Sequence, residues 1–157
     1  MCGITGFVSL KENLTSGENR AVLERMNRAI AHRGPDEDGF YTRDQAALAM
    51  RRLAIIDLKG GQQPIFSSDR TKAIVYNGEV YNFQELRAEL EKLGHEFYTN
   101  CDTEVIVHLY DRYGADCVRH LRGMFAFAIW DERARRLFCA RDRAGEKPFY
   151  YALAGGA

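Results

Sequence analysis

The sequence has no excess of charge of either sign, because 22 lysine and arginine residues balance 22 aspartate and glutamate residues. A neutral chain is not typical of proteins whose main partner is nucleic acid or an anionic membrane, so we expect neither partner. The longest apolar run, residues 124–130, is far too short to span a bilayer. The first 20 residues contain four charged side chains and no long apolar core, so they do not resemble a secretory signal.

Cysteine pairs with metal-binding spacing are also missing, since the four cysteines include no C-x-x-C pair. Without an export signal we expect reduced thiols in a cytoplasmic protein, and the apolar run around Cys139 predicts that this side chain packs in the core. Cys117 and His120 have no second Cys/His pair nearby in the sequence, so we expect no metal site. The sequence lacks G-x-x-x-x-G-K-S/T, G-x-S-x-G and G-x-G-x-x-G motifs, which argues against a phosphate-binding loop and a serine nucleophile elbow.

Length and hydrophobic pattern predict one α+β domain with a substantial core, since 46% of the 157 residues are hydrophobic. Apolar residues with helical spacing indicate helices over residues 18–31, 83–93 and 103–113. Strands are predicted over residues 3–10, 39–42, 46–50, 53–57, 72–76, 95–99, 123–130, 136–141 and 149–153. Their hairpin-like connections favour antiparallel sheets.

Short local signals refine this prediction. Asn77-Gly78 after a strand is, taken alone, typical of a tight turn. Asn82 with Glu85 three residues later predicts a capping box at the start of the second helix. Asp102 is a good N-cap for the third helix. Residues 154–157 indicate the start of a linker or a disordered tail.

The chain begins Met1-Cys2-Gly3, and removal of Met1 before a small side chain would make Cys2 the first residue. That residue would then carry both a thiol nucleophile and a free α-amine, which titrates at about 7.7–8.0, near the pH where a general base is useful. Most early cysteines are inert buried side chains, so this signal needs support from the rest of the sequence.

That support comes from polar and glycine-rich segments at the ends of predicted strands, namely Cys2-Gly3, Arg33-Gly34-Pro35-Asp36, Asn77-Gly78-Glu79 and Cys101-Asp102-Thr103-Glu104. Further blocks are Arg51-Arg52-Leu53-Ala54-Ile55-Ile56-Asp57, Gly61-Gln62-Gln63-Pro64, residues 121–127 and residues 141–148. In this order they resemble the class II glutamine amidotransferase domain of the asparagine synthetase-like family. The resemblance covers nearly the whole chain and implies an N-terminal nucleophile hydrolase fold, a four-layer αββα sandwich of two antiparallel sheets between helices, over residues 2–153.

The resemblance implies a glutaminase in which the Cys2 thiolate attacks the side-chain amide of glutamine and forms a γ-glutamyl thioester. Ammonia leaves, water releases glutamate, and the Cys2 α-amine carries the proton. Asn77 and Gly78 match the oxyanion hole, through the Asn side chain and the Gly backbone N–H. The residues implied to bind the substrate are Arg52, Leu53, Ile55, Ile56, Glu79 and Asp102, with Arg52 on the α-carboxylate and Glu79 and Asp102 on the α-ammonium. Arg33 and Asp36 match a supporting loop beside the site.

Each assignment has a plainer alternative in the sequence. Arg52 could be a solvated strand-edge side chain, Asp102 an N-cap alone, and the two isoleucines ordinary core residues. As a whole, the chain could be a non-catalytic glutamine-binding or regulatory module, or a partner-docking scaffold. The combination of Cys2, Asn77, Gly78, Arg52 and Asp102 favours the enzyme, since a pure binder needs no thiol.

The resemblance implies no cofactor for this domain. ATP and Mg would belong to a synthetase domain with a Ser-Gly-Gly-x-Asp-Ser loop, which the sequence does not contain. The expected partners are L-glutamine and a synthetase domain or subunit that accepts ammonia. A homodimer is left open, and the sequence does not identify the ammonia acceptor, with aspartate as the default.

Overall fold

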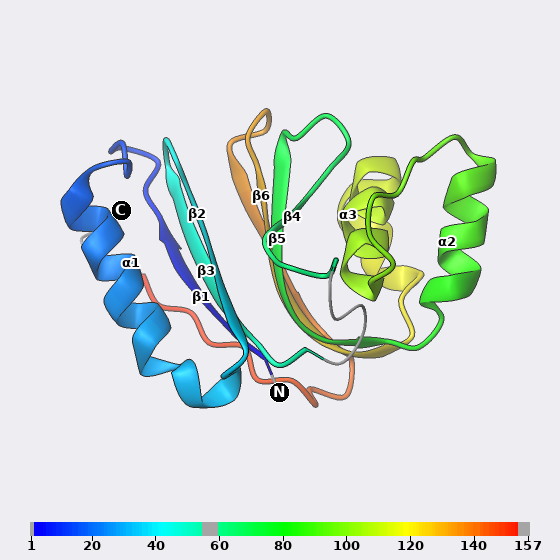
Figure 1. The fold of residues 1–157 in the computed structure, drawn as a ribbon. Helices are drawn as coiled ribbons and strands as arrows, with labels where there is room; N and C mark the ends of the chain where they lie inside the picture. Colours follow the sequence, from blue (N-terminus) through cyan, green and yellow to red (C-terminus); the bar gives the residue numbers. More distant parts are fainter. Residues whose placement is uncertain (1, 55–59, 154–157) are drawn as a thin grey trace.

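The computed structural model describes residues 2–54 and 60–153, and in this part of the chain two antiparallel sheets face each other (Figure 1). The first sheet has the order β1-β3-β2 and the second the order β4-β5-β6-β7. The strands are β1 (Gly3–Val8), β2 (Glu37–Arg43), β3 (Ala46–Arg52), β4 (Ile65–Phe66), β5 (Lys72–Val80), β6 (Gly123–Asp131) and β7 (Arg136–Arg141). Every pairing within the sheets is antiparallel.

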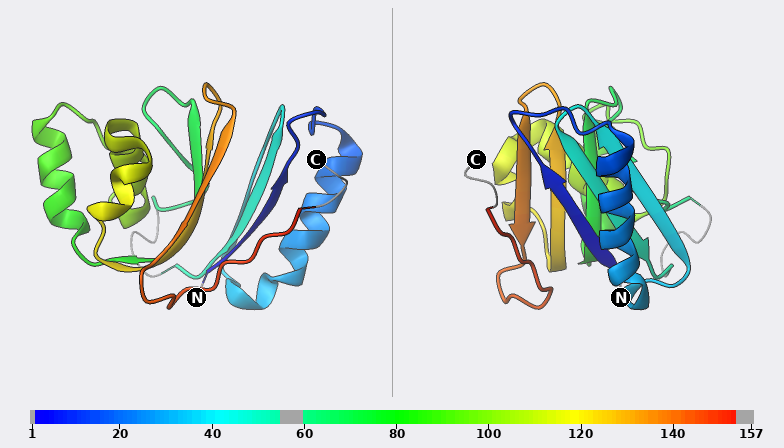
Figure 2. Two further views of the ribbon diagram at one scale, coloured as in Figure 1. Left: turned by 180° about the vertical axis from the view of Figure 1, so that it is seen from behind. Right: turned by 90° about the vertical axis from the view of Figure 1, so that its left-hand side faces the viewer.

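Helices cover the outer faces of both sheets, as Figure 2 shows from two further sides. Helix α1 (Gly17–Ala29) lies on the three-stranded sheet, and α3 (Asp102–Tyr113) lies on the four-stranded sheet. Helix α2 (Phe83–Lys92) packs on α3, and two short 3-10 helices, η1 (Ala31–Arg33) and η2 (Gly114–Arg119), follow α1 and α3. This arrangement confirms the predicted αββα sandwich of the N-terminal nucleophile fold.

The alternation of side chains along the strands explains why the layers pack in this way. In β6, Phe125, Phe127 and Ile129 enter the core beneath α3, whereas Ala128 and Trp130 pack between the two sheets. In β3 the larger Leu48 and Met50 face the second sheet, and Ala47 and Ala49 face α1. Small residues on that face allow the helix to approach the sheet closely.

Several predicted elements differ from the structure. Residues 95–99 form no strand, because the N–H groups of Tyr98 and Thr99 donate to the side chain of Glu104 and not to a neighbouring strand. Residues 149–153 form no strand either, and Tyr150 and Tyr151 there are exposed. The strand predicted over residues 46–50 is β3, which continues to Arg52; of the strand predicted over residues 53–57, Leu53 and Ala54 belong to no strand and residues 55–57 lie outside the described residues.

Three local predictions also need correction. Asn82 does precede α2, but its side chain makes no cap; it accepts from Arg122 N (2.9 Å) and donates to His120 O (3.0 Å), which joins the helix start to a distant loop. The N-cap of α3 is Cys101, and Asp102 lies inside the helix. Cys139 is exposed, because its neighbours in the edge strand β7 take the positions against the core.

The turn predicted at Asn77-Gly78 is wrong as well. Both residues lie within β5, opposite Ala126 and Phe125 of β6. Glycine is required at position 78 because a Cβ there would lie 2.2 Å from the carbonyl oxygen of Met124. The sequence pair that suggests a turn therefore marks a place where two strands approach closely.

Candidate active site

A cavity of about 100 Å³ lies where the ends of both sheets meet the first turn of α3. It is lined by Cys2, Arg52, Leu53, Gly61, Gln63, Tyr76, Asn77, Gly78, Glu79, Cys101, Asp102, Thr103, Met124 and Lys147. The structure thus brings together, from four distant parts of the sequence, seven of the predicted site residues: Cys2, Arg52, Leu53, Asn77, Gly78, Glu79 and Asp102. Ile55 and Ile56 lie outside the described residues.

The Cys2 thiol is held at the end of β1 by the backbone that follows β3. The N–H of Leu53 donates to Cys2 Sγ at 3.4 Å, and the thiol lies 3.7 Å from the Leu53 carbonyl oxygen. Asp36 fixes that backbone from both sides, since its own N–H donates to Arg52 O (3.1 Å) and its carboxylate accepts from Ala54 N (2.9 Å). Asp36 therefore supports the backbone that contacts the Cys2 thiol and is not among the residues that line the cavity. Arg33 packs against the backbone of Gly3, next to Cys2.

Arg52 is not a solvated strand-edge side chain. It is only 4% exposed, and its guanidinium forms an ion pair of 2.7 Å with Glu37, which stands opposite it in the β2–β3 register. The neighbouring Arg51 instead reaches Asp38 at 3.5 Å in a more exposed position. Glu37 was not predicted from the sequence, since its position relative to Arg52 depends on strand register. Its effect is to orient the planar guanidinium at the wall of the cavity.

The edge of β5 presents a backbone N–H to the cavity. Strand β4 covers this edge for only two residues, and beyond it side chains take over: Gln63 Oε1 accepts from Tyr76 N (2.7 Å), and Asp102 Oδ2 accepts from Val80 N (2.9 Å). In an antiparallel strand alternate N–H groups point to the same side. The N–H of Gly78, midway between the other two, therefore points away from β6 and toward the cavity that Gly78 lines.

Asn77 and Gly78 offer the two kinds of hydrogen-bond donor that an oxyanion hole uses. Asn77 is 5% exposed and lines the same cavity as Gly78. A backbone donor and an amide donor side by side, on a rigid strand, are preorganised for negative charge that develops on a bound carbonyl oxygen. Gln63 was not predicted as a site residue, although it lies within a motif that carried the family resemblance.

Asp102 faces the cavity from the first turn of α3 and is 5% exposed. Its carboxylate accepts from the Tyr76 hydroxyl at 2.8 Å as well as from Val80 N. Burial raises the pKa of Asp102 above its ordinary value, the two hydrogen bonds oppose this rise, and the nearby Glu79 adds to it. The same burial, together with the charge of Asp102, raises the pKa of Tyr76 well above its ordinary value. A cationic ligand would therefore stabilise the ionised form of this buried carboxylate.

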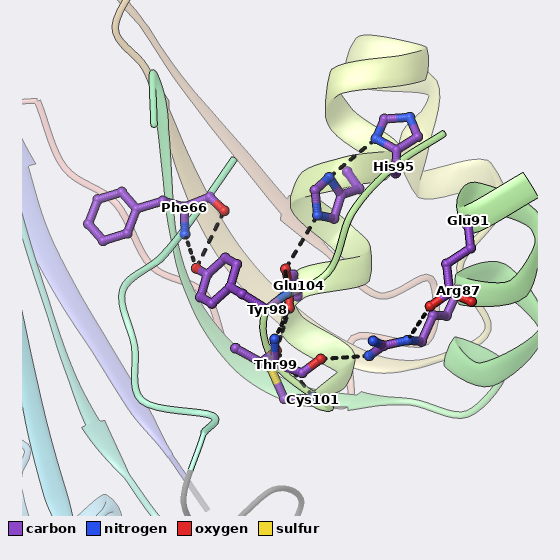
Figure 3. A network of polar contacts seen from close by, with 9 residues as sticks. Phe66, Arg87, Glu91, His95, Tyr98, Thr99, Cys101 and Glu104 are labelled. Atoms are coloured by element: carbon purple, nitrogen blue, oxygen red, sulfur yellow. Dashed lines mark hydrogen bonds and ion pairs between the residues drawn. The ribbon is translucent and has the colours of Figure 1, made fainter. Parts of the chain in front are cut away.

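A second, fully buried carboxylate holds the loop that leads into α3 (Figure 3). Glu104 accepts from Tyr98 N (2.9 Å), from Thr99 N (2.7 Å) and from the Thr99 hydroxyl, and it lies 3.4 Å from His108 Nε2. His108 contacts His95 in turn, with 3.3 Å between the two Nδ1 atoms. This network fixes the residues directly before Asp102.

The loop is also tied to its surroundings by two side chains on its outer side. Arg87 of α2 donates to Thr99 O at 2.6 Å and pairs with Glu91, and the Tyr98 hydroxyl accepts from Phe66 N at 2.8 Å, as Figure 3 shows. Burial alone would raise the pKa of Glu104, but the hydrogen bonds from His108, Thr99 and Tyr98 outweigh it and the pKa is lowered. Glu104 is thus a stably ionised anchor for the start of α3.

Within residues 2–54 and 60–153 no group of three or more His, Cys, Asp or Glu side chains is arranged to hold a metal ion. In that same part of the chain none of the helices has the length and apolar character needed to cross a bilayer.

The fold resembles a solved amidotransferase. The glutamine phosphoribosylpyrophosphate amidotransferase of B. subtilis, in complex with ADP and GMP, matches 66% of this chain and 24% of its own, with a TM-score of 0.54 and 27% sequence identity. Two facing antiparallel sheets between helices form the N-terminal nucleophile fold, which this chain shares with that amidotransferase.

The sequence comparisons give the family. The profile described as "Glutamine amidotransferase domain" matches residues 1–157, and the chain belongs to this family. Asparagine synthetase [glutamine-hydrolyzing] 3 of Bacillus subtilis (strain 168) is 43% identical over 159 residues, which cover 100% of this chain and 26% of the relative. Asparagine synthetase [glutamine-hydrolyzing] of Zea mays is 42% identical over 150 residues, which cover 96% of this chain and 25% of the relative. The chain thus spans about a quarter of these relatives, and the family predicted from the sequence is confirmed.

Proposed function

We propose that this domain hydrolyses the side-chain amide of L-glutamine and supplies the ammonia to a synthetase domain or subunit that converts aspartate to asparagine. The observation that carries the proposal is the convergence of Cys2, Arg52, Asn77, Gly78 and Asp102 on one cavity. The names of the relatives support asparagine synthesis as the use of the ammonia. A non-catalytic glutamine-binding module would need no thiol at this position, and no observation favours it.

Glutamine is held by its charged end, in this proposal. The Arg52 guanidinium, oriented by Glu37, receives the α-carboxylate, and the carboxylates of Asp102 and Glu79 receive the α-ammonium. The side-chain amide then extends toward Cys2 and the edge of β5. Asparagine, one methylene shorter, cannot place its amide there while its charged end stays bound.

Chemistry begins with attack of Cys2 Sγ on the amide carbon, and the thiol proton passes to the Cys2 α-amine. The amide oxygen becomes an oxyanion that accepts hydrogen bonds from the Asn77 side chain and the Gly78 N–H. When the C–N bond breaks, the α-ammonium returns its proton to the leaving nitrogen, and ammonia departs from a γ-glutamyl thioester. Water, deprotonated by the same amine, attacks the thioester carbon, and the sulfur leaves as thiol with glutamate as the product.

The test is ammonia and glutamate release from purified protein with glutamine or asparagine as substrate. We expect equal amounts of glutamate and ammonia from glutamine and none from asparagine. Because the mechanism uses the Cys2 α-amine, intact-mass measurement should show that the active form lacks Met1. Equal turnover of asparagine would contradict the binding geometry, and full activity of a Met1-retaining preparation would contradict the role of the amine.

A further inference from the structure

Gln63 lines the cavity, and the mechanism above gives it no role. It is 9% exposed, and its side-chain oxygen accepts a hydrogen bond from Tyr76 N at 2.7 Å. The strand register explains why this contact matters. Strand β4 places Ile65 opposite Ile74 of β5, and the same register continued by two residues would place Gln63 opposite Tyr76. The side-chain carbonyl of Gln63 therefore replaces the backbone carbonyl that would accept from Tyr76 if β4 continued.

The backbone of Gln63 is held elsewhere, against the first sheet. A Cβ atom at Gly39 of β2 would lie 1.7 Å from the carbonyl oxygen of Gln63 and 2.8 Å from its carbonyl carbon. Glycine at position 39 thus allows the chain to approach β2 this closely. Gln63 consequently contacts both sheets, with its backbone packed on β2 and its side chain bonded to β5.

The cavity lies where the ladder between β4 and β5 would otherwise continue. Two residues beyond Gln63, the same register would place Gly61 opposite Gly78, and both glycines line the cavity instead. On one side of Gly78 along this edge, the N–H of Tyr76 is bound by Gln63, and on the other side the next N–H is bound by Asp102. The Gly78 N–H between them has no acceptor within residues 2–54 and 60–153.

We propose that Gln63 is a positioning residue of the oxyanion hole. Its side chain ends the ladder between β4 and β5 at Tyr76, so that the next N–H on this edge, that of Gly78, stays open and fixed toward the amide oxygen. This inference rests on the proposed glutaminase function. Without the acceptor, the edge of β5 beside Gly78 loses a fixed hydrogen bond, and a donor displaced by about 1 Å can lower the rate on the order of a hundredfold.

The first test measures amide hydrogen exchange by NMR in the wild-type protein and uses no glutamine. After correction for local sequence, we expect the Tyr76 and Val80 amides to exchange about tenfold or more slowly than the Gly78 amide, because a bonded amide exchanges only when the structure opens. A Gly78 amide that is protected as well as its two neighbours on this edge overturns the proposal, and this result needs no variant to fold.

Variants then connect the exchange pattern to the side chain of Gln63. Gln63→Met removes the strong acceptor and keeps a long unbranched side chain, so the Tyr76 amide should exchange about tenfold faster or more. Gln63→Glu keeps an oxygen acceptor and should keep Tyr76 protected. Gln62→Met is the matched control, because Gln62 is the exposed neighbour in sequence and should leave the pattern unchanged. Unchanged protection of Tyr76 in Gln63→Met contradicts the proposal.

The second test is glutamine hydrolysis by the same proteins. Gln63→Met should lower kcat about tenfold or more with little change in KM, because the Gly78 donor acts on the oxyanion, and Gln62→Met should match the wild type. A change in KM alone would place Gln63 in ground-state binding and contradict the proposal. A wild-type protein that hydrolyses no glutamine would contradict the proposed function, and the exchange pattern would then still decide whether Gln63 ends the ladder.

Discussion

Two carboxylates on the first turn of α3, Asp102 and Glu104, are buried to nearly the same degree but lie in opposite environments. Asp102 is 5% exposed and faces the cavity, where burial and Glu79 raise its pKa despite two hydrogen bonds. Glu104 is fully buried in the loop network, where hydrogen bonds and His108 outweigh burial and its pKa is lowered. The protein compensates the negative charge of Asp102 only in part, so a cationic ligand would stabilise its ionised form. The charge of Glu104 is fully compensated by hydrogen bonds within the protein.

This difference separates the residue that we propose binds substrate, Asp102, from the one that holds the fold, Glu104. A saturated carboxylate stabilises the native state and offers nothing to a ligand. An incompletely satisfied one weakens the native state slightly, and the protein recovers that free energy when a ligand supplies the missing charge. Proximity in sequence and equal burial are therefore poor guides to function. The hydrogen-bond partners of each carboxylate oxygen determine whether the residue can bind a ligand.

The largest effect on stability is expected at Glu104. Each of its oxygens accepts from a backbone N–H, so Glu104→Gln must turn an amide NH₂ against a buried donor. We expect the free energy of unfolding to fall by about 3 kcal/mol, as for a broken buried charge network. Asp102→Asn is the matched control and should change it by less than about 1 kcal/mol, since burial already disfavours the charge of Asp102. Equal losses in denaturant titrations would remove the distinction between the two residues.

The same pair predicts opposite pH dependences. Because the folded-state pKa of Glu104 is below its ordinary value of 4.5, its contribution to stability is present above that value and is lost as the pH falls through the lowered pKa. The pKa of Asp102 is raised above 3.8, so its contribution is greatest at low pH and fades as the pH rises through the raised pKa. Unfolding measured from pH 3 to 7 in both isosteric variants should show slopes that differ from wild type in opposite directions.

Asn77 is proposed to take part in the chemical step and not in substrate binding. It is proposed to act only on the oxyanion, so Asn77→Ala should lower kcat on the order of a hundredfold or more and leave KM nearly unchanged. Steady-state kinetics with glutamine measure both constants. If the variant altered KM alone, Asn77 would be a residue of the binding site and the β5 edge would not be an oxyanion hole.

Arg52 and Asp102 should show the reverse pattern, because they are proposed to contact the charged end of glutamine in ground and transition states alike. Arg52→Ala and Asp102→Ala are expected to raise KM by about tenfold to a hundredfold with a smaller change in kcat. Arg52→Lys should restore little, because a point charge cannot reproduce the planar fork. A good rescue by lysine would show that only charge matters at this position.

The smallest effect concerns Tyr76, whose hydroxyl stabilises the ionised form of Asp102. Without this hydrogen bond the pKa of Asp102 should rise further, and a protonated Asp102 cannot bind the α-ammonium. Tyr76→Phe should therefore shift the acid limb of the kcat/KM profile to higher pH and leave kcat at neutral pH little changed. An acid limb at the wild-type position would show that Asp102 does not control binding.

The local pattern predicted an antiparallel α+β protein, and the family resemblance carried by the motifs predicted the four layers of the fold and most of the cavity. Neither predicted Glu37, Gln63 or Tyr76, since each reaches the site through strand register or a side chain that crosses between segments. The sequence pair Asn77-Gly78 was misassigned to a turn because local statistics cannot include the approach of β6. Asp102 was misassigned as an N-cap for a similar reason: its partners Tyr76 and Val80 lie on β5, 26 and 22 residues away in sequence.

The central claim is that Cys2 is the nucleophile of this cavity, and ammonia release by two cysteine variants tests it most directly. Cys2 lines the cavity, whereas Cys139 is exposed on β7 and does not. With glutamine as substrate, Cys2→Ala should release no ammonia above background while it unfolds at the wild-type denaturant concentration, and Cys139→Ala should keep wild-type turnover. Undiminished ammonia release by a correctly folded Cys2→Ala protein would contradict the account.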